Sequence, residues 1–533
     1  MELRALATAA LAALALAAPP AQAAELERPP QDDVAPAGFT MTADEATAVA
    51  RRDEKVRAAR RVNTGPGPLF TSRLRPTAYI RSPGRWQVSW FVGDDEVVQV
   101  HVDDRTGAIL ESWDGDQVAW RMARGYEGAF GRKWNSPWLL VPLGLLFLLP
   151  FVDVRRPLRL LHLDLLVLLG FGVSHVFFNR GEIGLSVPLV YPVLLYLGAR
   201  MLWEGRRRRE RDGALVPHVP LGAMAFGVIF LAGFRAGLNI LDSNVIDVGY
   251  SGVIGADRIA DGEPLYEGEF APDNQSGNVY GPVAYLAYLP FEQLLPWSGS
   301  WDDLPAAHAA AIAFDLLTLA GLYVLGVRLR SRALGVALAY AWATFPYSLF
   351  ALSTNSNDTL VAALLVWALV GAASPVARGA LLAFASAAKF APLALVPLFA
   401  RLGRPLRFAV AFLLVTAAAV LPFLPDGGLR DLYDTTLGFH AGRESPFSVW
   451  GQEDGLDWLH AIVKVAVAAL AVAVAVFPRD RDVVQTAALG AAALIALQLA
   501  AVHWFYLYVV WFTPFVLAAL FAAHRDAGRR VPA

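Results

Sequence analysis

The chain has 533 residues, of which 56% are hydrophobic and 17% are charged. Soluble domains carry about 25% charged residues, so this composition indicates a membrane protein. The formal net charge of -2 argues against a nucleic-acid partner, because such proteins need a basic excess. The chain has no cysteine, which excludes disulfides, thiolate metal sites and thiol nucleophiles.

Residues 1–23 have the pattern of a secretory signal peptide. Arg4 precedes an apolar run from Ala5 to Ala18, and small residues end the segment at Ala23. An uncleaved anchor helix is the alternative, although the apolar run is short for a membrane span. Both interpretations predict that the residues that follow are exported.

Residues 24–135 are predicted to form a small exported α+β domain. A capping box at Thr42–Glu45 predicts a helix that runs to about Val62. Alternating polar and apolar residues predict a meander of strands over 86–92, 96–102 and 108–113. The helix, the tryptophan-led strand and the Val-Asp-Asp-x-Thr-Gly turn resemble a PepSY-like domain over about residues 40–115, which implies a regulatory or peptide-binding module. The acidic pair in that turn is typical of turn chemistry rather than of a metal site.

The rest of the chain predicts an α-helical polytopic membrane bundle. Three membrane helices are expected over 136–213, and a larger membrane region over 214–524. Apolar segments near the length of a span lie at 137–152, 160–178, 184–203, 216–235, 280–297, 306–327, 333–352, 359–373, 378–400, 407–424, 458–477, 483–500 and 503–522. Arginine clusters predict cytoplasmic ends at 155–159, 206–209, 328–332, 401–407, 479–481 and 525–530.

Two of these segments conflict with a regular alternation of sides. Segments 280–297 and 378–400 both contain internal prolines, so we expect each to enter and leave the membrane on one side. Residues 236–279 and 425–457 then become long polar loops on the outer side, where a site is most expected. The sequence thus predicts a multi-pass protein of the plasma membrane whose exported domain and active site are extracytoplasmic.

The first outer loop contains two aspartates suited to act as a base. Asp247 lies just after a span and begins a predicted surface helix that reaches Ala260. Partial desolvation at the membrane boundary can raise a carboxyl pKa toward that of a useful base. The alternative is that Asp247 only caps that helix. Asp242 is its competitor, five residues earlier and closer to the span.

Three motifs in and after this loop resemble the polyprenyl-phosphate-mannose-dependent mannosyltransferases of the GT-C superfamily. They are Asp247-x-x-Tyr250, Gly262-x-Pro264-Leu265-Tyr266 and Tyr280-Gly281-Pro282. The resemblance covers about residues 216–520, with its specific part in the first outer loop and weaker similarities at 355–358 and 388–393. It departs at Gly281, where the family usually has proline, and the spans before residue 216 and the exported domain are additional.

The resemblance implies a GT-C-like fold that transfers a sugar from a polyprenyl phosphate to an acceptor hydroxyl on the outer leaflet. Mannose is the implied sugar, and an envelope glycolipid or polysaccharide is the implied acceptor. Asp247 matches the family's catalytic aspartate, while Tyr250, Tyr266 and Tyr280 are expected to bind donor or acceptor. No cofactor is implied. Neither outer loop has a paired acidic metal-binding motif, so we expect transfer without a metal.

Basic residues further along the chain are candidates for the phosphate of the sugar donor. Lys389, one of four lysines, lies in an apolar stretch, where a cation marks a functional site by default. The alternative is that it snorkels to the cytoplasmic interface. His440 and Arg443 in the second outer loop are expected to bind phosphate and sugar, against the alternative of an interfacial aromatic belt. His503 at the outer end of the last span is expected to line the cavity.

Two other classes of function compete with a membrane glycosyltransferase. In a transporter or flippase, Lys389 and the mid-span Asp315 would line a path through the membrane. In a non-enzymatic sensor, the exported domain would carry the function. Replacing Asp247 by asparagine separates the classes, because only a transferase should lose turnover. The polar run Asn355 to Asp358 is expected to terminate and cap helices rather than bind substrate.

Overall fold

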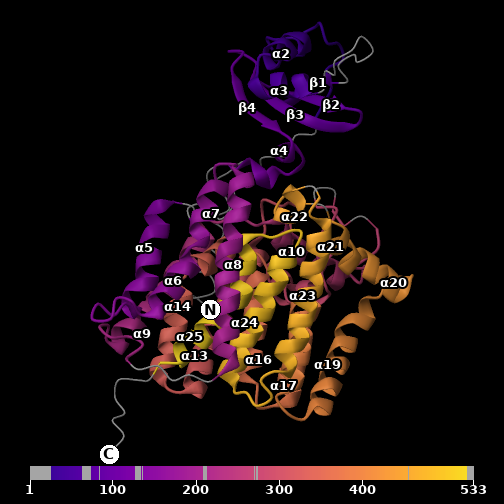
Figure 1. Ribbon diagram of the computed structural model, residues 1–533. Helices are drawn as coiled ribbons and strands as arrows, with labels where there is room; N and C mark the ends of the chain where they lie inside the picture. Colours follow the sequence, from indigo (N-terminus) through magenta and orange to yellow (C-terminus); the bar gives the residue numbers. More distant parts are fainter. Residues whose placement is uncertain are drawn as a thin grey trace, which may run out of the picture. The chain divides into compact units, whose positions relative to one another are not determined.

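The computed structural model describes residues 26–62, 74–82, 84–125, 134, 136–207, 213–268, 270–271, 274–443, 445–453 and 455–524 (Figure 1). The chain divides into two compact units, residues 1–124 and 125–533. The predicted signal peptide at 1–23 lies outside the described residues. A helical membrane bundle with a small α+β unit is therefore confirmed as the fold class.

The N-terminal unit is a four-stranded antiparallel sheet in the order β1-β2-β3-β4, packed on two short helices. Its elements are α2 (Ala43–Ala50), α3 (Glu54–Val62), β1 (Leu74–Ser82), β2 (Arg85–Val92), β3 (Asp95–Asp103), β4 (Ile109–Asp114), α4 (Asp116–Ala119) and the 3₁₀ turn η1 (Arg121–Arg124). Alternate residues of β2 and β3, among them Trp86, Val88, Val98 and Val100, face the helices and form the core.

The predicted elements of this unit are confirmed with two differences. The capping box between Thr42 and Glu45 is present, but the expected single helix is broken between α2 and α3. Strand β1 escaped prediction because Pro76 interrupts its pattern, although proline is tolerated on an edge strand. Asp103 accepts hydrogen bonds from the backbone N–H and hydroxyl of Thr106, so it has the expected turn role.

The second unit is entirely helical in its described residues. Its first half contains α5 (Pro137–Leu148), η3 (Leu149–Phe151), α6 (Leu160–Leu169), α7 (Phe171–Phe178), α8 (Ile183–Arg206), α9 (Leu221–Leu241), α10 (Asp247–Asp261), α11 (Val283–Leu286), α12 (Leu289–Glu292), α13 (Pro305–Leu329), α14 (Arg332–Thr344) and α15 (Pro346–Ser353). Its second half contains α16 (Asp358–Val370), α17 (Pro375–Ala388), η4 (Ala391–Leu395), α18 (Val396–Ala400), α19 (Pro405–Val420), η5 (Leu421–Phe423), α20 (Gly428–Tyr433), the π-helix η6 (Asp434–Gly438), α21 (Phe439–Gly442), α22 (Val449–Gln452), α23 (Asp457–Val476), α24 (Val483–Ala500), η7 (Tyr506–Tyr508) and α25 (Val509–Ala522).

Seven helices of the described residues are long and apolar enough to cross a membrane. They are Leu160–Phe178, Ile183–Arg206, Leu221–Leu241, Pro305–Leu329, Pro405–Phe423, Asp457–Val476 and Val483–Ala500. The pair α14 and α15 passes the same test as one span bent by 58°. A multi-pass membrane protein follows from these helices.

Arginine side chains bind the carbonyl groups at one end of this bundle. Arg328 donates to the carbonyl of Val370 at the end of α16, and Arg330 donates to that of Ala522 at the end of α25. Free carbonyls at helix ends need such partners. The starts of α16 and α25 must then lie toward the opposite end of the bundle.

Segment 378–400 turns back on itself, in agreement with the predicted re-entrant path. The guanidinium of Arg378, near the start of α17, donates to the carbonyls of Phe399 (3.1 Å) and Gly403. Both ends of the segment therefore lie side by side, with the break at Lys389 in between. Segment 280–297 forms only the four-residue helices α11 and α12, and it contributes no span.

Candidate functional site

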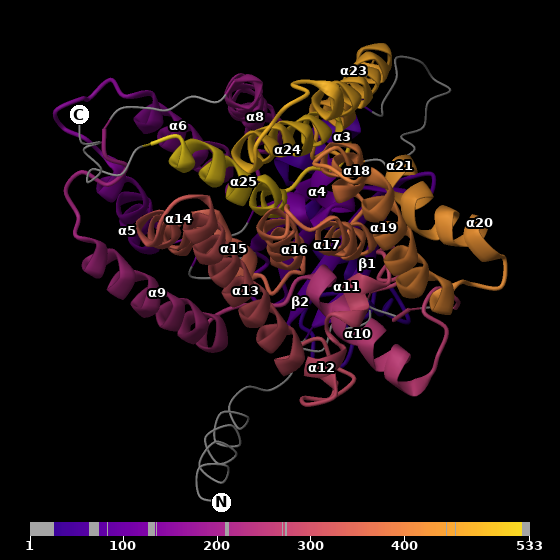
Figure 2. The same cartoon turned by 90° about the horizontal axis from the view of Figure 1, so that it is seen from below.

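Three interruptions of helices meet at one end of the bundle. This end is opposite to the one where Arg328 and Arg330 bind helix carbonyls. Asp247 is the first residue of α10, Asp358 is the first residue of α16, and Lys389 directly follows α17. Figure 2 shows α10, α11, α16 and α17 grouped together, and α16 packs on α17 while α11 bridges α10 and α17. Residues at helix breaks carry backbone groups and side chains that the helices do not use, so they are free to build a site.

Lys389 forms a buried ion pair with Asp358. Its Nζ lies 2.7 Å from Asp358 Oδ1, and the two residues are 8% and 1% exposed. The indole N–H of Trp511 donates to the same carboxylate oxygen at 2.8 Å. The snorkelling alternative for Lys389 is therefore wrong, because the side chain turns into the bundle instead of toward its surface.

Aromatic rings surround the ammonium of Lys389 on its other sides. Its Nζ lies 5.5 Å from the ring centre of Tyr280, 5.8 Å from that of Tyr508 and 5.4 Å from that of Trp511. Ring faces attract a cation at these distances while adding no negative charge. The rings therefore leave the charge of the ammonium unchanged, whereas the carboxylate of Asp358 offsets part of it.

Asp247 faces this cation from the loop at 236–279. The residue is exposed, yet protein surrounds it closely enough that the loss of bulk water raises the pKa of its carboxyl. The backbone N–H of Val248 and the charges of Arg443 and Lys389 oppose that rise, while the charge of Asp358 adds to it. A solvent-accessible carboxylate with a raised pKa suits a general base.

The loop at 425–457 brings His440 and Arg443 to the same place. The His440 ring on α21 lies 5.8 Å from that of Tyr280. Burial, followed by the charges of Arg443 and Lys389, lowers the pKa of His440 to about 4, so its imidazole is neutral near pH 7. Arg443 is half-buried, and its charge acts on Asp247 and His440 alike.

His503 lies beside this group. Its Nδ1 is 2.8 Å from the hydroxyl of Ser445, and its ring packs edge-on against Phe447. Burial and the neighbouring Arg443 and His440 lower the pKa of His503 to about 3, which makes it a neutral hydrogen-bonding residue. The predicted residues Asp247, Tyr280, Lys389, His440, Arg443 and His503 thus come together from segments far apart in the sequence.

Three other predicted residues have different surroundings. Tyr250 is buried in the core, stacked on Trp301 at 4.7 Å between ring centres. The buried hydroxyl of Tyr266 donates to the carbonyl of Tyr280 at 2.8 Å, so it holds the loop that carries Tyr280. Asp242 terminates α9 and is half-buried. The structure therefore does not bring Tyr250 or Tyr266 to the cation directly.

Gly281 accounts for the departure from the family's Tyr-Pro-Pro pattern. A Cβ atom at this position would collide with the carbonyl oxygen of Ala387, two residues before the break at Lys389. A glycine lets the loop of Tyr280 approach α17 this closely. That approach helps to place the Tyr280 ring over the ammonium.

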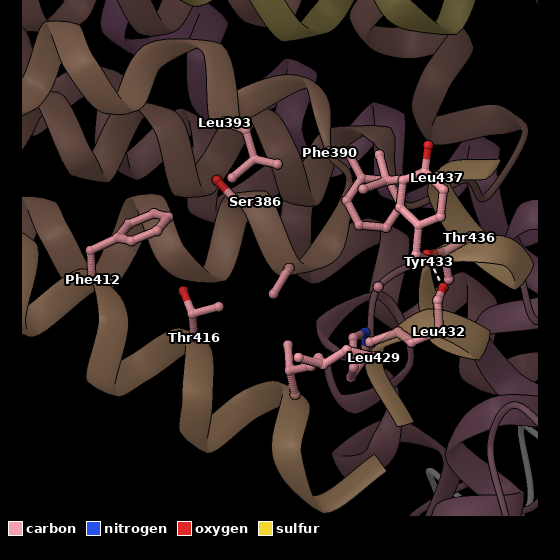
Figure 3. Close-up of a pocket in the computed structure, with 14 residues that line it drawn as sticks. Ser386, Phe390, Leu393, Phe412, Thr416, Leu429, Leu432, Tyr433, Thr436 and Leu437 are labelled. Atoms are coloured by element: carbon pink, nitrogen blue, oxygen red, sulfur yellow. Dashed lines mark hydrogen bonds between the residues drawn. The ribbon is translucent and has the colours of Figure 1, made fainter. Parts of the chain in front are cut away.

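Two cavities open beside the site. The first has a volume of about 420 Å³ and is lined by Tyr280, Lys389, Phe390, Ala391, Leu393, Ala394, Leu437, His440, Leu497, Gln498, Ala501, Tyr508 and Trp511. The second has a volume of about 250 Å³ and an almost wholly apolar wall, which is built from α17, α19, α20 and η6 (Figure 3). The cavities share Phe390, Leu393 and Leu437, so the almost wholly apolar compartment adjoins the one that contains Lys389 and His440.

Several members of this site escaped sequence reasoning. Asp358 was expected only to cap a helix, and Tyr508 was not named among the candidate residues. Trp511 was not singled out, because it lies within an apolar span. A tryptophan N–H or an acidic side chain within an apolar segment needs a hydrogen-bond partner when it is buried, so each one is a weak sign of a polar site. Among the described residues, no three or more histidines or acids are grouped as a metal site.

Asp315, the residue that a transporter would use, has a fixed pair of partners. Arg235 lies 2.6 Å from its Oδ1, and the indole N–H of Trp342 donates to the same oxygen at 2.8 Å. Arg235 also binds the carbonyl of Ala343 at 2.9 Å. This closed network favours a structural role that joins α9, α13 and α14 over a proton-carrying role.

Residues 278–501 match the family model of Glycosyltransferase family 87. The matched region contains Tyr280, Asp358, Lys389, His440 and Arg443, and it begins after Asp247. A search of curated proteins found no match to the chain. The family match supports a membrane glycosyltransferase, which acts on a sugar donor and an acceptor.

Proposed function

From the match to glycosyltransferase family 87, we propose that the protein moves a sugar from a polyprenyl phosphate to a hydroxyl of an envelope glycolipid or polysaccharide on the outer leaflet. Mannose is the first sugar to test, because the loop motifs around Asp247 resemble those of mannosyltransferases. The observation that carries the proposal is the exposed Asp247 carboxylate set against the cations Lys389 and Arg443. A base and an anion site within one electrostatic neighbourhood suit displacement of a phosphate by a hydroxyl.

The reaction is a single displacement at the anomeric carbon. Asp247 takes the proton of the acceptor hydroxyl while that oxygen forms the new glycosidic bond. The bond between the anomeric carbon and the phosphate oxygen breaks, and its electron pair leaves with the polyprenyl phosphate. Because the leaving group is an anion, it needs positive charge rather than a proton.

Lys389 and Arg443 supply that positive charge in the proposal, and the neutral His440 and His503 supply hydrogen bonds. Asp358 balances part of the charge of Lys389, while the aromatic rings exclude water and add no negative charge, so Lys389 and Arg443 together would still attract a phosphate. The apolar cavity between α17, α19 and α20 gives the isoprenoid chain a place next to the phosphate. Tyr280 offers a ring on which a sugar can stack.

A transfer assay with the purified full-length protein tests the proposal. Polyprenyl-phosphate sugars with different sugar groups are supplied with an envelope glycolipid fraction, and nucleotide sugars serve as the comparison set of donors. We expect transfer from a lipid-phosphate donor and loss of that transfer in Asp247→Asn. Transfer from nucleotide sugars alone, or equal rates for wild type and Asp247→Asn, would overturn the proposed donor or the proposed base respectively.

A further inference from the structure

Asn355 has an unusual backbone conformation at the break between α15 and α16. Its φ angle is +52°, in the left-handed region, which asparagine adopts more readily than most residues other than glycine. Such a conformation persists where its surroundings fix it. The side chain of Asn355 is fully buried at 0% exposure, and its contacts show what fixes it.

The amide of Asn355 binds three groups on the path that leads to Asp247. Its Nδ2 donates to the hydroxyl of Ser243 at 2.9 Å and to the carbonyl of Asn244 at 3.0 Å. Its Oδ1 accepts from the side chain of Asn239 at 2.7 Å. One side chain therefore joins the end of α9 to the segment that enters α10.

The backbone around Asn355 continues this attachment up to the residue before Asp247. The N–H of Asn244 donates to the carbonyl of Ser353 at 3.1 Å, and that of Ile246 donates to the carbonyl of Thr354 at 2.9 Å. Within the first turn of α10, a Cβ atom at Gly249 would collide with the carbonyl oxygen of Asn355. The first turn of α10 thus packs directly against the backbone at Asn355, between α15 and α16.

A second layer of polar groups supports the asparagine from behind. The Nδ1 of His308 on α13 lies 3.1 Å from Asn239 Oδ1 and 3.2 Å from Ser243 Oγ. Ser243 Oγ also donates to the carbonyl of Asn239 at 2.6 Å. A fully partnered buried network of this kind fixes one geometry, because any shift leaves a buried group without its partner.

We propose that Asn355 is a positioning residue that fixes the Asp247 carboxylate toward the cations of the site. The inference rests on the proposed function, in which Asp247 is the base. The substitution Asn355→Gly would keep the backbone conformation without strain. It would remove the side-chain amide and its three hydrogen bonds. The left-handed conformation is what directs that amide back toward residues 239–244.

The test compares wild type with Asn355→Gly in the same transfer assay. Glycine keeps the backbone conformation, so the variant removes the side chain without new strain. Displacing a catalytic group by about 1 Å can cost about 10²-fold, so we expect kcat to fall by roughly 10- to 100-fold. The KM for the sugar donor should stay unchanged, because Lys389 and Arg443 are untouched.

Hydrogen exchange gives a readout that is independent of activity. The amides of Asn244 and Ile246 should exchange faster in Asn355→Gly, whereas those of α16 should keep their wild-type rates. Ser243→Ala removes a single partner and should change kcat and exchange in the same direction by less. It replaces Asn355→Gly as the test if that variant does not fold.

Arg404→Gly is the matched control. Arg404 is the other described non-glycine residue with a positive φ angle, at 49°, and it begins α19 away from the site. This variant should retain the wild-type kcat and exchange rates. Wild-type kcat and exchange in Asn355→Gly, with Asp247→Asn inactive, would overturn the positioning role and leave the function standing. Equal activity of wild type and Asp247→Asn would instead remove the proposed function, whatever Asn355→Gly does.

Discussion

At the residue scale, the state of Asp247 is set by a balance between lost solvation and nearby cations. Loss of bulk water raises the pKa of its carboxyl, while Arg443 and Lys389 lower it. Too few cations would leave the carboxyl protonated and unable to accept a proton. Too many would leave it a weak base, so the intermediate value is what proton abstraction from a hydroxyl needs.

The direction of this shift predicts the acidic limb of the pH profile. A base works only in its ionised form, so kcat/KM should fall as the pH drops through the raised pKa of Asp247, above the ordinary range of an aspartate. Because Arg443 lowers that pKa, Arg443→Gln should move the limb to higher pH. A limb that stays in place in Arg443→Gln, measured over the same buffers, would contradict the assignment of Asp247 as the base.

Removing the Asp247 carboxylate should lower kcat with little change in the KM for the sugar donor. General-base catalysis contributes about 10²- to 10⁴-fold, so Asp247→Asn should lose a factor of that order. Asp242→Asn is the matched control in the same loop, and it should retain most of the activity. The reverse ranking of the two variants in steady-state assays would identify Asp242 as the base.

The buried pair of Lys389 and Asp358 predicts a combined loss of stability and of binding. Breaking a buried ion pair costs about 3–5 kcal/mol, so Asp358→Asn should lower the thermal unfolding temperature. It should also raise the KM for the sugar donor, because Lys389 loses its anchor. Asp315→Asn breaks the buried pair with Arg235 and should destabilise the fold to a similar extent. The KM for the sugar donor should be unchanged in the folded fraction of Asp315→Asn and raised in Asp358→Asn. This difference would show that the pair of Asp358 and Lys389 serves donor binding, whereas the pair of Asp315 and Arg235 serves only stability.

At the element scale, hydropathy predicts the long spans, and interruptions of helices determine the site. Helices such as α13 and α24 were predictable because an apolar stretch of their length has few other structures in a membrane. The pairing of Asp358 with Lys389 could not be predicted from the sequence, because it depends on how the broken segment 378–400 folds back. Hydropathy alone gave segment 280–297 nearly the length of a span, but its prolines divide the apolar run into two short helices.

The close packing of α10 against Asn355 gives a prediction at this scale. Gly249 contacts the break at Asn355 so closely that any side chain must push α10 away, so Gly249→Ala should lower kcat by displacing Asp247. Gly237 on α9 has open space where a Cβ would be added, so Gly237→Ala is the matched control. The two variants should differ in turnover, and they should also differ in hydrogen exchange of the first turn of α10. Equal turnover would show that the close contact at Gly249 is not needed to place the base.

At the scale of the whole molecule, the described site draws all its residues from the second unit. Asp247, Asn355, Lys389 and Arg443 all lie beyond residue 125, and the N-terminal unit has its own core. Two compact units with separate cores can fold and act separately. The regulatory or peptide-binding role that the PepSY-like resemblance predicts for the first unit would then be additional to transfer.

This division predicts that sugar transfer survives the separation of the units. A protease recognition sequence inserted between residues 129 and 130 allows the purified full-length protein to be cut after it has folded in the membrane. With a small soluble acceptor, the cut protein should keep the kcat and the donor KM of the uncut protein, because no residue of the described site is removed. The parent protein without the inserted sequence, treated with the same protease, controls for cutting elsewhere. A loss of turnover that appears only on cutting at the inserted sequence would place part of the catalytic machinery in the N-terminal unit.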